Sequence, residues 1–334
     1  MTVPRPRLVF MGTPELARVV FAGLAEDARW EIPLVVAQPD KPVGRGLHLT
    51  APPVKREALE RGIPVLQPAR ARDPGFLEAF AAASPDVVVV AAYGQILPPA
   101  LLEIPSRGCL NVHTSLLPRW RGAAPIAWAI LEGDAETGVA IMRMEAGLDT
   151  GAIVAEERTP IAGDDTGQSL HDRLAEMGAR LIRRVLPDWI AGRLTPIPQP
   201  AEGVTYARKL TREDGRLDWT QPASAIDRRI RALNPWPGAF TTLPSGDSGG
   251  GLLKIWEASP CDRVPVGDGR PAARAGEVVS VNADGLVVAT GDERMDLRIL
   301  ALQREGRRRM SAREFLAGGG VKPGDRLGAT PHAA

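Results

Sequence analysis

Cysteine is scarce in this sequence, which has only Cys109 and Cys261 among 334 residues. Two cysteines cannot build a disulfide framework or a cysteine-rich metal cluster, so we expect a fold without disulfides and without a metal cofactor. Long apolar runs are missing too: the longest, residues 87–92, is far short of the roughly 18 residues that a membrane helix needs. Residues 1–7 lead directly into the strand-like residues 8–10, so we expect no signal peptide, no membrane association and a cytoplasmic location.

Net charge is also close to zero, with 41 Lys and Arg against 40 Asp and Glu. A balanced total argues against a nucleic-acid partner for the chain as a whole. The total conceals two segments of opposite sign, because residues 204–334 hold 20 basic and 16 acidic residues, a net of +4, and the remainder has a net of −3. A basic C-terminal segment can bind an RNA backbone, so the near-zero total does not exclude an RNA partner.

The order of strand and helix patterns predicts the fold class. An apolar share of 44% and a charged share of 24% are ordinary for a globular protein, and 334 residues suffice for two domains. Strand and helix patterns alternate in the first part of the chain, which predicts an α/β fold with a doubly wound, mainly parallel sheet. The expected strands are 8–10, 32–37, 87–91, 109–112, 139–142 and 153–155, and the expected helices are 14–24, 54–61, 74–83, 123–132 and 166–190.

The pattern changes after residue 191. Pro196, Pro198 and Pro200 favour an extended connection, so we expect a catalytic domain at 1–191, a linker at 192–207 and a second domain at 208–334. The second domain shows short strands separated by turn residues, which predicts a small β-barrel. Its expected strands are 239–243, 252–258, 276–281, 285–290 and 294–300, and its expected helices are 223–232 and 311–317.

The residues that can carry chemistry lie between 109 and 150. Asn111 and His113 are two residues apart on an expected strand, so their side chains share one side, at the sheet edge where ligands gather. Asp149 follows the next strand on a loop flanked by glycines. An amide that donates to a developing oxyanion, an imidazole that carries a proton and a carboxylate that orients it form a plausible acyl-transfer set. From the residues alone, other interpretations stay open: Asn111 can be a turn residue, His113 a buried histidine with satisfied hydrogen bonds, and Asp149 a helix cap.

The same segment resembles a known family. Asn111-Val112-His113, the segment 115–126 and Asp149, which is 38 residues after Asn111, closely resemble the signature of the folate-dependent formyltransferases. The resemblance implies a Rossmann-like catalytic domain and an OB-fold-like barrel, catalytic roles for Asn111, His113 and Asp149, and transfer of a formyl group from 10-formyltetrahydrofolate to an amine, with release of tetrahydrofolate. The resemblance also implies a folate site in the segments that follow the strands. Its expected residues are Tyr93, Gly94, Ile96, Leu97, Pro98, Ser115, Leu116, Leu117, Pro118, Met144 and Gly147.

Four further segments narrow the choice of the amine that accepts the formyl group. Residues 38–55, 205–211, 230–239 and 303–315 resemble the family members that formylate methionyl-initiator tRNA for translation initiation. The tRNA contacts that this resemblance implies are Lys41, Arg45, Lys55, Lys209, Arg307, Arg308 and Arg309. One departure is that Leu47 and His48 stand where relatives often have lysines, which predicts that tRNA binding through this loop is weaker or is moved elsewhere.

Two other functions stay open at this point. A formyltransferase for a sugar amine or a nucleotide would share the segment from Asn111 to Asp149 but would need no basic loop and no basic barrel. A non-catalytic tRNA-binding protein would need the basic barrel but not the three catalytic residues. We expect a monomer.

Overall fold

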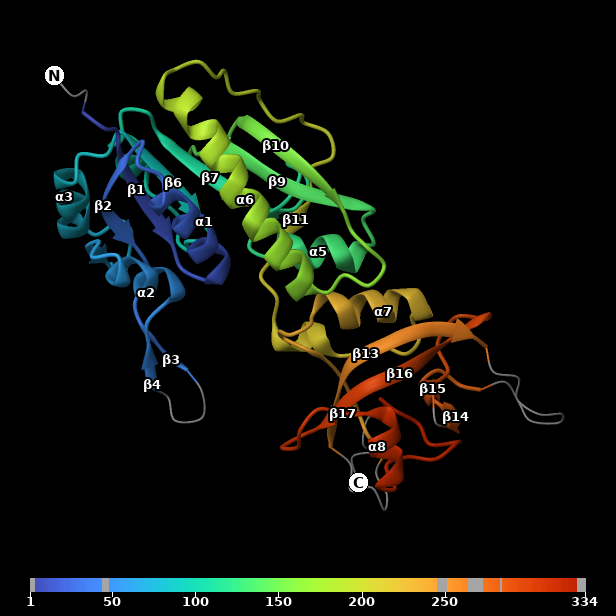
Figure 1. The fold of residues 1–334 in the computed structure, drawn as a ribbon. Helices are drawn as coiled ribbons and strands as arrows, with labels where there is room; N and C mark the ends of the chain where they lie inside the picture. The colour runs from blue at the N-terminus through green and yellow to red at the C-terminus, as the bar shows by residue number, and fades with distance from the viewer. Residues whose placement is uncertain (1–3, 44–47, 245–250, 264–272, 283, 329–334) are drawn as a thin grey trace. The chain divides into compact units, whose positions relative to one another are not determined.

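The computed structural model describes residues 4–43, 48–244, 251–263, 273–282 and 284–328 (Figure 1). The chain divides into two compact units. The first comprises Met1–Ile126, Glu136–Pro160 and Leu170–Lys209, and the second comprises Ala127–Ala135, Ile161–Ser169 and Leu210–Ala334. Among the helices of the described residues, none combines the length and the apolar character of a membrane span. The domain limits of 191 and 208 stay a prediction.

A seven-stranded sheet forms the centre of the first unit, with the strand order β10-β9-β7-β6-β1-β2-β5. Strands β5, β2, β1, β6 and β7 are parallel, whereas β9 and β10 are antiparallel to their neighbours, so the predicted mainly parallel sheet is confirmed. The strands are β1 (Arg7–Gly12), β2 (Glu31–Val36), β5 (Val65–Leu66), β6 (Val87–Ala91), β7 (Cys109–His113), β9 (Glu136–Arg143) and β10 (Ile153–Pro160).

Helices cover both faces of this sheet. Phe10 of β1 packs against Phe21 of α1, with ring centroids 5.3 Å apart. Its neighbour Met11 lies instead in a core cluster with Phe76 and Phe80 of α3, so alternate residues of β1 face opposite layers, as the doubly wound prediction requires. The helices of the first unit are α1 (Glu15–Ala25), α2 (Pro53–Glu60), α3 (Pro74–Ala82), α4 (Pro99–Leu102) and α6 (Gly167–Ile190), which belongs to this unit from Leu170 on. Most of α5 (Pro125–Glu132) belongs to the second unit.

The long helix α6 lies across the strands that carry the candidate site (Figure 1). Its buried side chains, among them Leu174 and Leu181, repeat at helical spacing and form one apolar face. Gly178 lets the helix approach β7 closely, because a Cβ there would lie 2.8 Å from Cγ1 of Val112. The strand that holds Asn111 and His113 is therefore fixed by packing on α6.

Two short strand pairs interrupt the alternation of the first unit. A hairpin of β3 (Lys41–Val43) and β4 (His48–Thr50) carries the loop that resembles a tRNA-binding segment. Arg45 and Leu47 lie outside the described residues. A second pair, β8 (Arg121–Gly122) and β11 (Tyr206–Ala207), is parallel and joins the loop after His113 to a segment more than 80 residues later in the chain.

The second unit is an antiparallel β structure around one core. Its sheet has the order β12-β13-β16-β15-β14, and β17 pairs with β16, so the predicted β domain is confirmed. Strands β13 and β16, of 11 and 10 residues, are longer than predicted. Trp219 lies within the core and donates a hydrogen bond of 3.0 Å to Oγ1 of Thr241. The elements are β12 (Ala239–Thr242), β13 (Leu252–Asp262), β14 (Val278–Asn282), β15 (Gly285–Val288), β16 (Met295–Arg304), β17 (Met310–Ser311), α7 (Ala223–Ala232), α8 (Ala312–Ala317) and a 3-10 turn at Arg212–Gly215.

We expect Gly138→Ala to destabilise the first unit. Gly138 lies in β9, and a Cβ there would lie 2.1 Å from the carbonyl oxygen of Glu157 on β10 and 2.6 Å from the Leu116 side chain. Such overpacking costs about 1–3 kcal/mol of the free energy of unfolding, measured by denaturant titration. The control is Gly163→Ala, since nothing lies within 4 Å of a Cβ there. Equal stability of the two variants would contradict this packing.

Candidate active site

The last residues of β7 place two candidate catalytic side chains at the carboxyl edge of the sheet. Strand order reverses between β1 and β6, one strand away from β7, because β2 and β5 follow on one side of β1 and β6 and β7 follow on the other. Ligands of doubly wound sheets bind at the carboxyl ends of the strands near such a reversal. His113 is 6% exposed, and Asn111 is half-buried. The position predicted for this pair is therefore the position observed.

The structure brings Asp149 to both of these residues. Its Oδ1 lies 3.5 Å from Nδ2 of Asn111, and its Oδ2 lies 3.8 Å from Nδ1 of His113. The backbone N–H of Gly122 donates to Oδ2 at 2.8 Å. Asp149 has a positive φ of 52°, a conformation that is costly for a residue with a side chain. The three predicted catalytic residues therefore form one cluster, held by a backbone donor.

The environment of the His113 ring limits where its proton lies. Nε2 is 3.0 Å from the carbonyl oxygen of Trp120. A carbonyl only accepts hydrogen bonds, so Nε2 carries a proton, and Nδ1 is the nitrogen that faces Asp149. In the neutral ring Nδ1 can accept a proton, and in the charged ring it donates toward the carboxylate. The arrangement thus lets His113 gain and lose a proton on the side of Asp149.

The amide of Asn111 has spare donor capacity. One N–H points to Asp149 at a long distance of 3.5 Å. The second N–H has no hydrogen-bond partner in the described part of the chain. A donor of this kind beside a proton-carrying histidine suits a carbonyl oxygen that becomes negative during acyl transfer.

The segment after β6 contains both exposed and core residues. The carbonyl oxygen of Tyr93 accepts hydrogen bonds from Thr13 at 2.9 Å and Gln38 at 3.0 Å, which holds this segment against the ends of β1 and β2. Ile96 is 90% exposed, whereas Tyr93 and Leu97 lie in the core. Burial raises the pKa of the Tyr93 hydroxyl to about 12. Of the predicted folate residues here, Ile96 has a side chain that is open to solvent, while the side chain of Tyr93 is buried and leaves only its backbone for a contact.

The other predicted folate residues occupy two loops. Ser115 is fully buried, and its hydroxyl donates to the carbonyl oxygen of Arg119 at 2.6 Å. Leu117 packs on β9, while Met144 is half-buried and its N–H donates to the carbonyl oxygen of Cys109. The remaining predicted residues of these segments are Gly94, Pro98, Leu116, Pro118 and Gly147, of which Gly94 and Gly147 are exposed. Their binding role stays a prediction.

Most predicted tRNA-contacting side chains of the described chain already have partners. Lys55 forms an ion pair with Asp40 at 2.8 Å, and Lys41 donates to Gln38 at 2.7 Å. Arg308 pairs with Glu314 at 2.7 Å, and Arg309 pairs with Glu257 at 3.4 Å. Hydrogen bonds from Arg308 and Ser311 lower the pKa of Glu314 to about 2. Lys209 and Arg307 form no ion pair with a described carboxylate.

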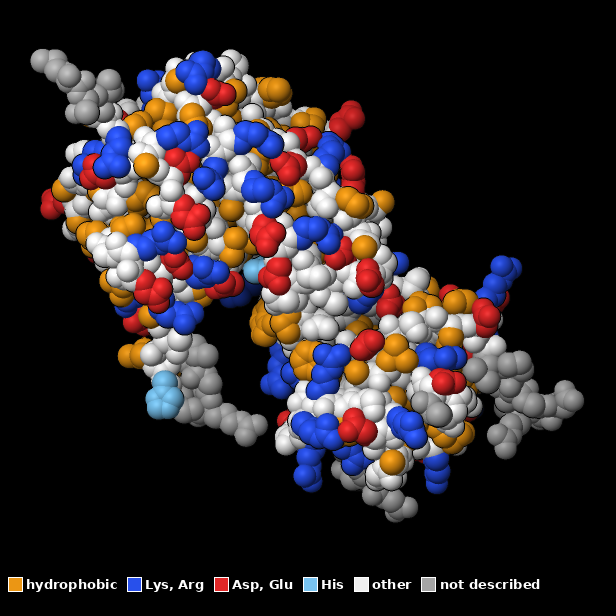
Figure 2. All heavy atoms as spheres, in the orientation of Figure 1, with side chains coloured by type: hydrophobic (Ala, Val, Ile, Leu, Met, Phe, Trp, Pro, Cys, Tyr) orange, Lys and Arg blue, Asp and Glu red, His pale blue; other side chains and the backbone are white. Residues whose placement is uncertain are grey.

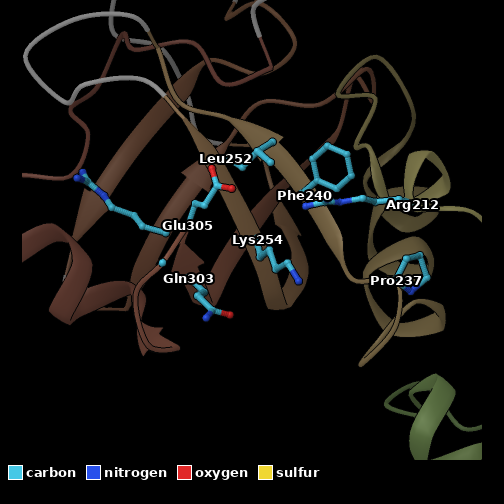
Figure 3. A pocket seen from close by; sticks show the side chains of 9 residues that line it. Arg212, Pro237, Phe240, Leu252, Lys254, Gln303 and Glu305 are labelled. Atoms are coloured by element: carbon cyan, nitrogen blue, oxygen red, sulfur yellow. The ribbon is translucent and has the colours of Figure 1, made fainter. Parts of the chain in front are cut away.

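A hollow of about 180 Å³ lies in the second unit (Figure 3). Arg212 and Lys254 reach into it, and neither pairs with a carboxylate of the described residues. Basic side chains also cover more of this unit's visible face than acidic ones (Figure 2). Sequence reasoning missed this hollow, because no local pattern joins residues that the fold assembles from four segments. Its lining residues are Arg212, Pro237, Phe240, Leu252, Lys254, Gln303, Arg304, Glu305 and Gly306.

The doubly wound sheet and the cluster at its carboxyl edge are compatible with a group-transfer enzyme. Residues 7–186 match the family model "Formyl transferase", and residues 209–320 match "Formyl transferase, C-terminal domain". The chain therefore belongs to the formyl transferase family.

Two relatives within the family have a more specific name. The chain is 51% identical to the methionyl-tRNA formyltransferase of Myxococcus xanthus, with 96% of this chain and 97% of that one covered. It is 50% identical to the enzyme of the same name from Acidovorax ebreus, with 97% and 100% covered.

Solved structures support the fold. An N-formyltransferase from Helicobacter canadensis has a TM-score of 0.64 at 16% identity, with 88% of this chain and 99% of that chain covered. HypX from Aquifex aeolicus has a TM-score of 0.62 at 17% identity, with 96% of this chain covered, and this chain spans about half of HypX, 50%. At these identities the likeness concerns the fold alone.

Proposed function

We propose that this protein transfers the formyl group of 10-formyltetrahydrofolate to the α-amino group of methionyl-initiator tRNA. The observation that carries the proposal is the identity of about half to proteins named methionyl-tRNA formyltransferase along nearly the whole of both chains, 51% for the first relative. Both parts of the chain match formyl transferase models, so the catalytic and the C-terminal segments support the same activity. The enzyme acts as a monomer in the cytoplasm, where initiator tRNA is charged.

The residues present fit a folate formyl donor. The exposed side chain of Ile96 offers apolar cover for a flat ring, and Asn111 offers a donor with spare capacity close to His113 and Asp149. The proposed folate contacts are the residues predicted from the sequence, with Tyr93 contributing backbone groups and Leu97 supporting the segment from the core.

The donor supplies the formyl group, and the methionine amine receives it and loses one proton, which ends on the folate nitrogen. Asn111 donates a hydrogen bond to the formyl oxygen as negative charge develops there. His113 in its charged form adds a positive charge beside that oxygen. Asp149 stabilises the charged ring through Nδ1, and its carboxylate holds the amine's proton between its loss and its transfer to the folate nitrogen.

The direct test is transfer of radiolabelled formyl from 10-formyltetrahydrofolate. Charged initiator tRNA, charged elongator methionine tRNA and amines of sugars and nucleotides are offered in parallel. We expect formylmethionyl-tRNA from the initiator tRNA and little product from the rest. Product from a sugar or nucleotide amine alone identifies the other branch of the family. Tight tRNA binding without transfer identifies a binding protein.

We expect Asn111→Ala to lower kcat by about 10²–10³-fold, which is roughly 2.7–4 kcal/mol, because an oxyanion donor acts mainly in the transition state. Steady-state kinetics of formyl transfer measure this loss. The matched control is Asn282→Ala, an exposed asparagine of β14 in the other unit, which keeps the wild-type rate. Near-normal turnover by Asn111→Ala excludes its role as the donor.

The hollow of the second unit is the proposed site for a tRNA backbone phosphate. Lys254 of β13 lies 5.6 Å from the ring centre of Trp256, and Arg212 lies next to Phe240 (Figure 3). Cations without carboxylate partners are the ones available to a phosphate, whereas Arg308 and Arg309 must first leave Glu314 and Glu257. Arg307 extends the proposed contact surface of the second unit. Lys41 in β3, Lys55 in α2 and Lys209 are proposed tRNA contacts of the first unit, and Arg45 stays a contact predicted from the sequence.

We expect Arg212→Gln and Lys254→Gln each to weaken tRNA binding and to reduce the slope of log K against log salt by about 1, because each removes one phosphate contact. The KM for the folate and the kcat stay unchanged. Filter binding over a series of salt concentrations measures the slope. The control is Arg158→Gln, whose guanidinium is engaged by Glu136 and Glu156. A slope equal to that of the control contradicts a phosphate site in the hollow.

A further inference from the structure

Residues 197–207, which we call the strap, lie against both loops that complete the catalytic cluster. The strap begins with an antiparallel bridge between Ile197 and Ile153, just after the Asp149 loop. It ends with β11, which pairs in parallel with β8 in the loop after His113. All of these residues belong to the first unit. A proline-rich segment that sequence patterns treat as a plain connection therefore lies beside the candidate chemistry.

Gln199 uses the whole hydrogen-bonding capacity of its side chain within this region. Nε2 donates to the carbonyl oxygens of Asp149 and Gly151, both at 2.8 Å. Oε1 accepts from Arg121, at 3.1 Å from Nε and 2.7 Å from Nη2. The neighbours determine the amide orientation, because a reversed amide would face two acceptors with its oxygen and a guanidinium with its NH₂ group.

These bonds close a ring around the catalytic carboxylate. Gln199 holds the backbone on both sides of Thr150, while the side chain of Arg121 holds Gln199. The next residue, Gly122, donates its N–H to Oδ2 of Asp149. The positive φ of 52° at Asp149 costs about 1–2 kcal/mol, so this loop needs such restraints to keep its conformation.

A second contact from the strap reaches the partner of His113. Oγ1 of Thr205 accepts from the backbone N–H of Trp120 at 2.9 Å. The carbonyl oxygen of the same Trp120 faces Nε2 of His113 at 3.0 Å, and Trp120 also has a positive φ, of 63°. One segment thus restrains the backbone that carries Asp149 and the backbone that orients the imidazole.

We propose that the strap is a positioning element of the transferase: Gln199 sets the place of Asp149, and Thr205 sets the carbonyl that orients His113. The inference rests on the proposed function, in which both catalytic residues act together. Neither Gln199 nor Thr205 touches the reacting atoms. Their contribution is to hold the Asp149 carboxylate and the His113 ring in the geometry from which proton transfer is efficient.

The test compares Gln199→Met with Ile197→Ala. Met keeps the length and volume of the side chain and removes its four hydrogen bonds, whereas Ile197 lies on the same strap with its side chain 70% exposed and keeps its backbone bridge when truncated. We expect Gln199→Met to lower kcat about 10–100-fold, as loss of a supporting residue does, with the KM values for tRNA and folate within about twofold of wild type. Ile197→Ala keeps both parameters.

Two further variants keep the test decisive if Gln199→Met folds poorly. Gln199→Glu preserves the contact to Arg121 but turns a charged oxygen toward the carbonyls of Asp149 and Gly151, so it does not restore kcat. Thr205→Val removes the acceptor for Trp120 N–H and lowers kcat independently, because it acts through His113. Wild-type kcat in a folded Gln199→Met, or a changed KM with an unchanged kcat, overturns the proposal.

A spectroscopic measurement separates this inference from the proposed function. The amide proton of Gly122 lies in a short hydrogen bond to a carboxylate, which shifts its resonance downfield. We expect this resonance to move upfield in Gln199→Met and to stay in place in Ile197→Ala, without any substrate. An unmoved resonance contradicts the role of Gln199 whatever the enzyme formylates. Absence of formyl transfer by the wild type contradicts only the proposed function.

Discussion

The carboxylate of Asp149 is a largely buried charge, and its partners explain why the surrounding elements lie where they do. Its side chain is 13% exposed, and a carboxylate at that depth needs hydrogen-bond donors. The N–H of Gly122 and the amide of Asn111 donate to it, and Nδ1 of His113 lies 3.8 Å away. These groups come from β7 and from the loop after it, so the cluster forms only when the sheet, that loop and the Asp149 loop have folded together.

The central sheet determines how rigid this arrangement is. β7 lies between β6 and β9, and its residue Val112 faces the close approach of α6 at Gly178. Asn111 and His113 therefore come from a strand with neighbours on both edges and a helix against one face. Asp149 comes instead from a loop with unfavourable backbone geometry, so its position depends on hydrogen bonds from outside that loop. The candidate catalytic cluster therefore combines two side chains from a rigid strand with one from a loop that is held by hydrogen bonds.

Sequence patterns predicted the elements whose signal is local. The apolar run at 87–91 and the spacing of Asn111 and His113 are visible in short stretches. The first was confirmed as the buried strand β6, and the structure places the other two residues on one strand beside Asp149. The strap was not recognised, because Gln199 follows no periodicity and its partners lie 48 to 78 residues away. Ion pairs also join residues that are far apart in the sequence, such as Arg309 and Glu257, which are separated by 52 residues. A run of basic residues in the sequence therefore did not show which of its cations have carboxylate partners.

The net charge of the second unit shows the same limit of what the sequence can predict. The excess of basic residues after Val204 was counted from the sequence. Which of them can reach a phosphate depends on the fold, because Arg308 and Arg309 are paired while Arg212 and Lys254 meet in one hollow. The near-zero charge of the whole chain therefore says little about its RNA partner.

We propose that formyl transfer depends on the charge of Asp149 at this position. Asp149→Asn keeps the size and shape of the side chain and removes the charge that faces His113. The most direct measurement is the single-turnover rate of formyl transfer to methionyl-initiator tRNA at saturating substrates. We predict a loss of about 10²-fold or more, the usual contribution of acid–base catalysis, with unchanged binding of both substrates. A wild-type rate in this variant would contradict the dependence of formyl transfer on the charge of Asp149.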